Sequence, residues 1–193
     1  MAKNILVPMA NGNEDIELVS VIDILRRAKE FGGANINIIC ASLNDDLKVE
    51  LDSGLVVLAD TTLDKVDVST LDAIVLAGGF GGMMEFKSND KILSIIQNLN
   101  SQKKLIAAIC ASPIVLNAAG VLKGEFTCYP GCETGLNGTR VHKPVVVNEN
   151  IITSAGPITS SYFALTIIRE LGFIDAFNGV SEGMLIGDFG IKF

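Results

Sequence analysis

Short runs of apolar residues alternate with helix-like patterns along most of this chain, and the alternation restricts the folds it can adopt. Predicted strands occupy 5–9, 35–41, 73–77, 105–109, 145–147 and 151–153. Predicted helices run through 18–28, 92–99 and 162–171, and another begins near Pro113. Buried strands that alternate with amphipathic helices are typical of α/β proteins. The pattern therefore predicts a doubly wound fold with a mainly parallel central sheet and helices on both faces.

A small hairpin interrupts this pattern. Apolar pieces at 48–51 and 55–58 flank Asp52, Ser53 and Gly54, which are typical turn residues. We find no internal repeat, low-complexity tract or linker. We therefore expect one domain over residues 1–193.

Composition and charge exclude some classes of partner. The 193 residues are 49% hydrophobic and 19% charged, with a formal net charge of -7. Proteins that track a nucleic-acid backbone need clustered Lys and Arg, so nucleic acid is not an expected partner. The apolar run near the start is too short for a signal peptide or a membrane span, and no membrane contact is expected. We expect a cytoplasmic protein whose four cysteines stay reduced.

Cys110 stands where a predicted strand ends and a helix begins, in Ile-Cys-Ala-Ser-Pro. A sharp turn there lifts a nucleophile out of the packed layer, and helix N–H groups stabilise a thiolate. A free cysteine also often serves as a small apolar core residue. From this segment alone, both interpretations stay open.

Three polar or glycine-rich segments fall at the carboxyl ends of predicted parallel strands, where such folds place their chemistry. The first strand leads to Glu14, Asp15 and Glu17, the third ends at Gly78-Gly79, and the fourth ends at Cys110. This convergence favours a reactive cysteine.

The chain resembles the ThiJ/PfpI family in several motifs that occur in order along nearly its whole length. These are Ala-Asn-Gly-Asn-Glu-Asp-Ile-Glu-Leu (10–18), Val-Leu-Ala-Gly-Gly (75–79), Ala-Ala-Ile-Cys-Ala-Ser-Pro (107–113) and Thr-Ser-Ala-Gly-Pro (153–157). The similarity is greatest to the branch that contains the human Parkinson-linked member. The resemblance implies a flavodoxin-like sandwich, a homodimer and a site that pairs Cys110 with a glutamate.

Helical periodicity does not choose that glutamate, because Glu14 and Glu17 both align with core positions of the first helix. The family pattern selects Glu17, whereas Glu14 also fits the fourth position of a capping box that begins at Asn11. A carboxylate beside a thiolate in a dry pocket is repelled. We therefore hypothesise that Glu17 stays protonated, donates a hydrogen bond to the Cys110 sulfur and lowers the pKa of the thiol.

The resemblance also implies that the backbone N–H groups of Gly79 and Ala111 form an oxyanion-type donor pair. Gly78 and Gly79 let the chain turn sharply and let a ligand approach the amides. With Gly81 and Gly82 nearby, we expect this segment to be a loop over the site.

Two positions depart from the human branch. Tyr129 stands where that branch has a histidine, and the single histidine, His142, lies in a polar stretch typical of a surface strand. A Cys-His dyad, as in the peptidase branch, is therefore not expected. Ala155 replaces an arginine of the human branch, which predicts a less basic pocket.

Cys128 and Cys132 form a C-x-x-x-C pair. Too few further ligands accompany them for a zinc site, so no metal is expected. Cys128 is predicted to pack near the site, where one of the two thiols can act as a resolving thiol if it approaches Cys110. Cys40 is expected to be inert core.

Three functions remain. The resemblance implies a cofactor-independent glyoxalase or deglycase, in which Cys110 attacks a small carbonyl substrate or a glycated adduct and Glu17 moves the proton. The alternatives are a redox sensor of the oxidative stress response that uses oxidation of Cys110, and a chaperone that does not need the thiol.

Overall fold

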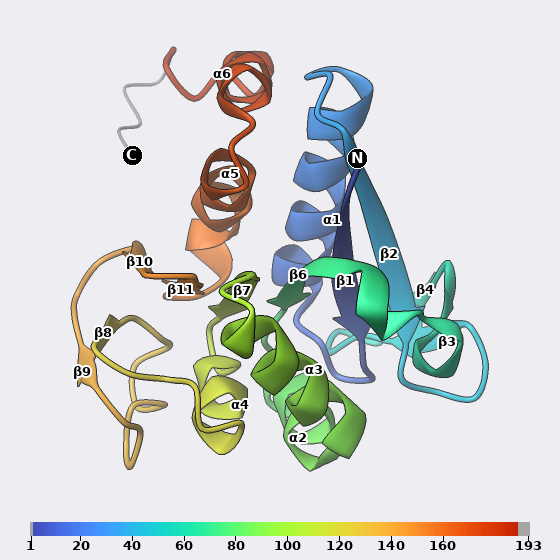
Figure 1. Cartoon of the computed structure of the whole chain (residues 1–193), viewed down its shortest axis with the longest axis vertical. Coiled ribbons are helices and arrows are strands. Elements are labelled where there is room, and N and C mark those ends of the chain that lie inside the picture. Colours follow the sequence, from blue (N-terminus) through green and yellow to red (C-terminus); the bar gives the residue numbers. More distant parts are fainter. Residues whose placement is uncertain (1, 189–193) are drawn as a thin grey trace.

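The structure is a computed structural model that describes residues 2–188. Within that range the main sheet has seven strands in the order β10-β11-β7-β6-β1-β2-β5, all parallel except β10 (Figure 1). The strands are β1 (Lys3–Met9), β2 (Ile36–Ser42), β5 (Thr61–Thr62), β6 (Leu71–Leu76), β7 (Leu105–Ile109), β10 (Val145–Asn148) and β11 (Ile151–Ser154). The predicted mainly parallel sheet is confirmed.

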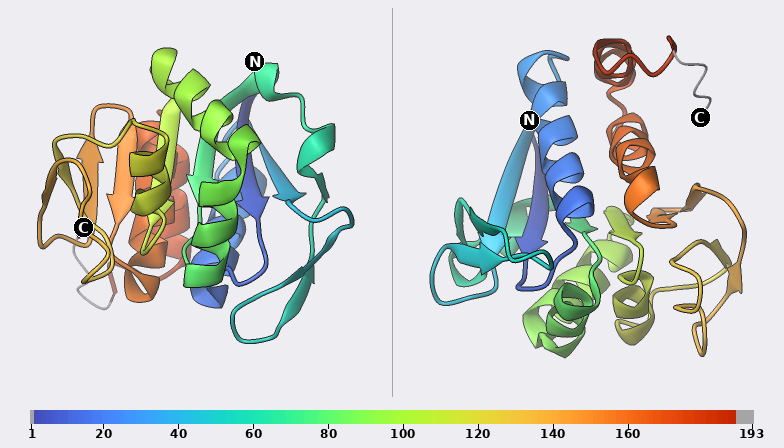
Figure 2. Two further views of the ribbon diagram at one scale, coloured as in Figure 1. Left: turned by 90° about the horizontal axis from the view of Figure 1, so that it is seen from below. Right: turned by 180° about the vertical axis from the view of Figure 1, so that it is seen from behind.

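Helices cover both faces of the sheet, as predicted (Figures 1 and 2). On one face, α1 (Asp15–Glu30), α5 (Ser160–Glu170) and α6 (Ile174–Gly183) share one hydrophobic core with the sheet. On the other face, α2 (Phe80–Ser88), α3 (Asp90–Ser101) and α4 (Pro113–Ala118) build the second core. The core face of α1 carries Leu18, Val21, Leu25 and Ala28, which are at most 1% exposed.

Smaller elements surround the sheet. The predicted hairpin is present as β3 (Lys48–Glu50) and β4 (Val56–Leu58), which form a separate two-stranded sheet. A further small sheet joins β8 (Glu125–Phe126) to β9 (Thr139–Arg140). Short 3-10 helices occupy Leu63–Lys65, Val68–Thr70 and Pro157–Thr159. None of the described helices combines the length and apolar character needed to cross a membrane.

The loop predicted over the site is largely helical, which is a correction. Gly81 and Gly82 lie in the first turn of α2 and pack against Gly12 and Asn13. A Cβ on Gly82 would collide with the Asn13 side chain. These glycines therefore allow close packing between a helix and a loop.

Candidate active site

Cys110 occupies a sharp turn between β7 and α4. Its φ of 64° lies in the left-handed region, which is unusual for a residue with a side chain and marks local strain. Two backbone hydrogen bonds of 2.9 Å hold it there, from Cys110 N to Ser154 O and from Tyr129 N to Cys110 O. The predicted strand-turn-helix setting is thus present, and Cys110 is 8% exposed.

Glu17 reaches the thiol from the first turn of α1, although it is fully buried. Its Oε2 accepts a hydrogen bond of 2.7 Å from Gly78 N. Its Oε1 is buried without a hydrogen-bond partner in the described part of the chain. Such an oxygen disfavours the charged carboxylate, and burial raises the pKa of Glu17 to about 7. The neighbouring Cys110 thiol and the Gly78 N–H act in the opposite direction and lower this pKa.

The thiol and the carboxyl share one environment, so their ionisations are coupled. Burial raises the pKa of Cys110, and the charge of Glu17 raises it further. Backbone N–H groups of Gly79 and Ala111 face the sulfur and lower this pKa. The pair therefore holds at most one negative charge near neutral pH. A lowered thiol pKa stays a prediction that requires the proton to remain on Glu17.

Glycines make room for this pair at the end of β6. A Cβ on Gly78 would lie 2.5 Å from Glu17 Oε2 and 2.7 Å from Cys110 Cβ. Gly79 precedes α2 with a φ of 85°, and a Cβ there would collide with the backbone of the loop that contains Gly12 and Asn13. Both positions thus require glycine for the close approach of three chain segments.

Gly79→Ala is expected to lower the free energy of unfolding by about 3 kcal/mol, because it combines left-handed strain with a backbone collision. Gly54→Ala is the matched control, since Gly54 has a φ of 87° with nothing within 4 Å of the added Cβ. Urea unfolding followed by circular dichroism measures both variants. Equal losses in the two proteins would show that the close approach at Gly79 contributes nothing.

Glu14 does not complete a capping box from Asn11, which corrects that interpretation. Glu14 is itself the N-cap of α1, and its Oε2 accepts a hydrogen bond of 2.7 Å from Glu17 N. Because Glu14 lies just outside the helix, its carboxyl binds the backbone of the first turn. Glu17, one turn further, is the residue that faces the sulfur.

Asn13 is a structural member of the site that the sequence patterns did not reveal. It is fully buried, its Oδ1 accepts from Ala10 N at 2.7 Å, and its Nδ2 donates to Gly78 O at 2.9 Å. It therefore ties the end of β1 to the end of β6. The turn around Gly12 was the only signal in the sequence.

Tyr129 and Cys128 lie in the loop that follows β8. Tyr129 is 46% exposed and reaches the site through its backbone bond to Cys110, and its ring borders Gly156. Cys128 is fully buried, with Sγ 3.9 Å from Glu133 Oε2, and burial raises the pKa of its thiol to about 11. All four cysteines are free. A resolving role for Cys128 or Cys132 stays a prediction.

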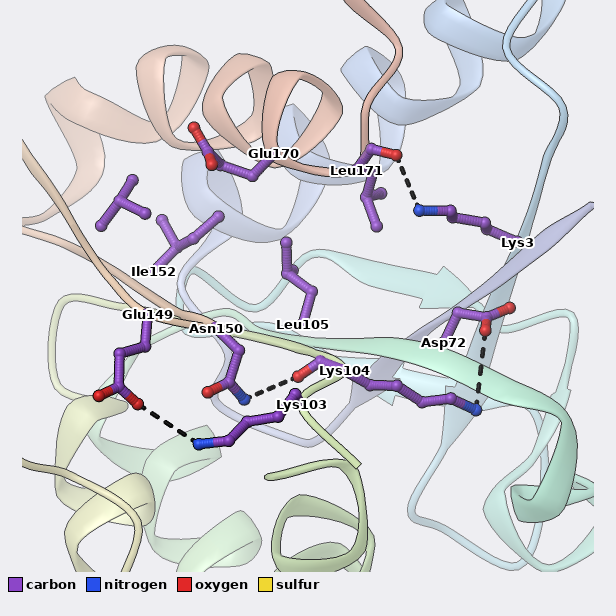
Figure 3. A pocket seen from close by; sticks show the side chains of 11 residues that line it. Lys3, Asp72, Lys103, Lys104, Leu105, Glu149, Asn150, Ile152, Glu170 and Leu171 are labelled. Atoms are coloured by element: carbon purple, nitrogen blue, oxygen red, sulfur yellow. Dashed lines mark hydrogen bonds and ion pairs between the residues drawn. The ribbon is translucent and has the colours of Figure 1, made fainter. Parts of the chain in front are cut away.

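Other features lie outside this site. Among the described residues, no group of three or more His, Cys, Asp and Glu side chains is arranged to hold a metal ion. Cys40 is buried in β2, where burial raises the pKa of its thiol to about 12. A cavity of about 570 Å³ lies at the amino ends of the strands (Figure 3). Lys3, Lys103, Lys104 and Asp72 line it, and it contacts none of the predicted site residues.

The model of the DJ-1/PfpI family matches residues 3–170, a range that contains Glu17, Gly79 and Cys110. The chain belongs to the DJ-1/PfpI family. This confirms the resemblance noted in the sequence.

Two curated DJ-1 relatives illustrate the similarity. Protein dj-1beta of Drosophila melanogaster is 35% identical over 190 residues, which cover 96% of this chain and 98% of the relative. DJ-1 homolog B of Arabidopsis thaliana is 38% identical over 169 residues, 86% of this chain. That alignment spans only 37% of the plant protein, so the chain corresponds to a part of it.

Solved DJ-1 structures share the fold. The crystal structure of Drosophila melanogaster DJ-1beta superimposes with a TM-score of 0.88 at 36% identity, covering 96% of this chain and 98% of the fly protein. The structure described as Toxoplasma gondii DJ-1, oxidized, gives 0.86 at 34% identity, with 95% and 98% coverage. The flavodoxin-like α/β fold expected from the resemblance is thereby established.

Proposed function

We propose that this DJ-1/PfpI protein is a cofactor-independent cysteine enzyme of the glyoxalase or deglycase type that acts on small reactive carbonyls in the cytoplasm. One observation carries the proposal: a buried carboxyl with a raised pKa and two backbone N–H groups all face the thiol of Cys110, whose backbone is strained. Perturbed ionisable groups that converge on a nucleophile are typical of catalytic sites.

The reaction balances without an added oxidant or reductant. The Cys110 sulfur adds to the aldehyde carbon of methylglyoxal, and Glu17 gives a proton to the carbonyl oxygen. The Glu17 carboxylate then removes the proton from that carbon and returns it to the neighbouring one, while the hydroxyl proton passes to the neighbouring oxygen, which leaves a thioester. Water cleaves the carbon–sulfur bond and releases lactate and one proton to the solvent, which restores the Cys110 thiolate and the protonated Glu17. The N–H groups of Gly79 and Ala111 stabilise the oxyanion that forms in the addition and hydrolysis steps.

The direct test is lactate formation from methylglyoxal by the purified protein. Turnover proportional to enzyme concentration, without added thiol or metal, is the expected result. A protein whose Cys110 is fully titratable by a thiol reagent but forms no lactate would contradict the glyoxalase proposal. Release of the free thiol or amine from methylglyoxal adducts of N-acetylcysteine and N-acetyllysine separates a deglycase from a glyoxalase.

Redox sensing is the second candidate function, favoured by the oxidised state named for the Toxoplasma relative. Two molecules of hydrogen peroxide would convert the Cys110 thiol to a sulfinic acid and yield two molecules of water. Mass spectrometry after titration with peroxide identifies the modified residue. Selective addition of two oxygen atoms to Cys110, ahead of Cys40, Cys128 and Cys132, is the expected result for a sensor. Equal oxidation of all four would contradict it.

We also propose a homodimer built on α1 and the β3–β4 hairpin. A groove between them is lined by Val19, Ile22 and Leu58, and nearby Ile16 and Leu55 are more than half exposed. An apolar surface that joins two elements suits a second copy of the same chain. The dimer implied by the family resemblance would cover it.

Leu58→Asp is expected to weaken dimerisation at least about 30-fold, because it places a carboxylate in the apolar contact. Ile158→Asp is the control, since Ile158 is 91% exposed and lies outside the groove. Sedimentation velocity over a concentration series measures the dimer dissociation constants of both variants. A wild-type protein that sediments as a monomer throughout would contradict the dimer.

A further inference from the structure

A cavity of about 340 Å³ is lined by residues that neighbour the backbone partners of Cys110. The segment that contains β8 and β9 lies beside β10 and β11 in this part of the molecule (Figure 1). Ala155, in its wall, follows Ser154, whose carbonyl accepts the hydrogen bond from Cys110 N. Pro130, also in the wall, follows Tyr129, which donates to Cys110 O. The cavity is thus one residue away from both backbone contacts of the nucleophile.

Three basic side chains line this cavity in a chain whose net charge is -7: Arg140, His142 and Lys143. Arg140 Nε donates to Cys128 O at 3.2 Å, which fixes the guanidinium beside the cavity and uses one of its five donors. Two acidic neighbours are present: the partly exposed Glu133 lies 3.9 Å from Arg140, and the exposed Glu125 lies 3.7 Å from Lys143. Neither carboxylate is among the residues that line the cavity.

The side chain of Thr127 also indicates a ligand in this cavity. This residue lines the cavity and is fully buried, and its Oγ1 has no hydrogen-bond partner among the described residues. Its backbone N–H is bound to Thr153 Oγ1 at 2.9 Å, which fixes the residue in place. A buried hydroxyl without a hydrogen-bond partner costs folding free energy. An oxyanion that accepts a hydrogen bond from this hydroxyl removes that cost.

We propose that this cavity binds the phosphate or carboxylate of the carbonyl substrate, so the substrates of the Cys110 site are small carbonyl compounds that carry an oxyanion. The inference rests on the proposed function and adds the substrate class to it. Arg140 and Lys143 attract the charge, and the Thr127 hydroxyl donates to an oxygen. In this proposal, β9 and the segment after it supply positive charge in place of the arginine that Ala155 replaces, so the pocket is more basic than expected from the sequence.

The binding test uses 2-phosphoglycolate, which has the oxyanion but no aldehyde, and isothermal titration measures its Kd. Arg140→Gln is expected to raise the Kd at least 10-fold, and Thr127→Val to raise it several-fold. Lys123→Gln, which removes one exposed positive charge outside the cavity, should stay within twofold of wild type. An unchanged Kd in both Arg140→Gln and Thr127→Val, or an equal loss in Lys123→Gln, would overturn the proposal. Circular dichroism checks that each variant is folded.

Inorganic phosphate and glycolate are each tested as competitors of bound 2-phosphoglycolate, which distinguishes a phosphate site from a carboxylate site. Competition by glycolate as strong as by phosphate assigns the cavity to carboxylates, and stronger competition by phosphate assigns it to phosphates. Failure of both phosphate and glycolate to compete would overturn the proposed site.

The reaction test compares hydroxypyruvaldehyde phosphate with hydroxypyruvaldehyde, two 2-oxoaldehydes that differ only in the phosphate. The wild-type protein is expected to prefer the phosphorylated compound at least 10-fold in kcat/KM, and Arg140→Gln to lose that preference. Equal kcat/KM values in the wild type would overturn the substrate class. Because the binding test needs no reaction at sulfur, Cys110→Ser should still bind 2-phosphoglycolate. Retained binding without any carbonyl turnover would refute the enzyme and leave the oxyanion site standing.

Discussion

Cys110→Ser is expected to reduce lactate formation from methylglyoxal by on the order of 10³-fold or more, because a neutral serine hydroxyl is a much weaker nucleophile than a thiolate and Glu17 is too weak a base to deprotonate it. The single histidine, His142, is exposed in the loop between β9 and β10, so it is not a base for residue 110. Glu17 is protonated over part of the neutral range, since its pKa is about 7. The loss should therefore appear in kcat and in kcat/KM alike.

Cys128→Ser is the matched control for this variant. Cys128 is also a buried free thiol, and it lies in the loop whose Tyr129 contacts Cys110. We expect Cys128→Ser to retain turnover within about threefold of wild type. Equal losses in the two serine variants would point to a shared disulfide step, and full activity in Cys110→Ser would refute cysteine catalysis.

Glu17→Leu is expected to lower turnover by about 10²- to 10⁴-fold, the usual contribution of a positioned acid or base. Glu17→Gln can donate a hydrogen bond to sulfur but cannot release a proton, so it should recover alkylation of Cys110 better than it recovers turnover. In the wild type, alkylation should rise with pH as the first ionisation of the pair places its charge on the sulfur. In both variants this rise should move to higher pH.

The rate of iodoacetamide labelling from pH 5 to 10 decides where the charge of the pair lies. Slower labelling of Glu17→Leu at pH 7 supports a thiolate stabilised by the protonated acid. Faster labelling would contradict it, because the pKa of Cys110 is raised by the charge on Glu17 and would fall once that charge is removed. Unchanged labelling would exclude any influence of Glu17 on the thiol.

Stability gives a second readout of the same carboxyl. The pKa of Glu17 is raised from its ordinary value of 4.5 to about 7 in the folded protein, so the folded state retains a proton that the unfolded state has lost between these values. The contribution of this retained proton to the free energy of unfolding is fully present below pH 4.5. It decreases as the pH rises towards 7, by about 3 kcal/mol in all. Glu17→Gln should remove this decrease, which urea titrations at pH 4.5, 6 and 7.5 measure.

Much of the fold and part of the site follow from local patterns. The buried strands were predictable because continuous apolar runs end at turn residues, and Cys110 was recognised because a proline in the next helical turn marks the junction. Periodicity left Glu14 and Glu17 undecided, since both share the core side of α1. The family pattern selected Glu17, and in the structure the start of the helix at Asp15 makes Glu14 the N-cap.

The remaining features depend on contacts between distant segments. Asn13 acts through a hydrogen bond to Gly78, which is 65 positions away in the chain. Gly81 and Gly82 look like loop residues, yet they lie in a helix because their missing side chains let it approach the loop of Gly12. Ala155, in the wall of the cavity that Arg140 and Lys143 also line, is brought near the Cys110 turn by the pairing of β11 with β7.

The two N–H groups that face the sulfur come from separate turns, Gly79 after β6 and Ala111 after β7. The electrostatic environment of Cys110 therefore exists only while these neighbouring strands keep their register. This makes the thiol a native reporter of local opening: in a denaturant series, a change in its labelling rate ahead of the global transition would reveal separation of the two turns without any attached dye.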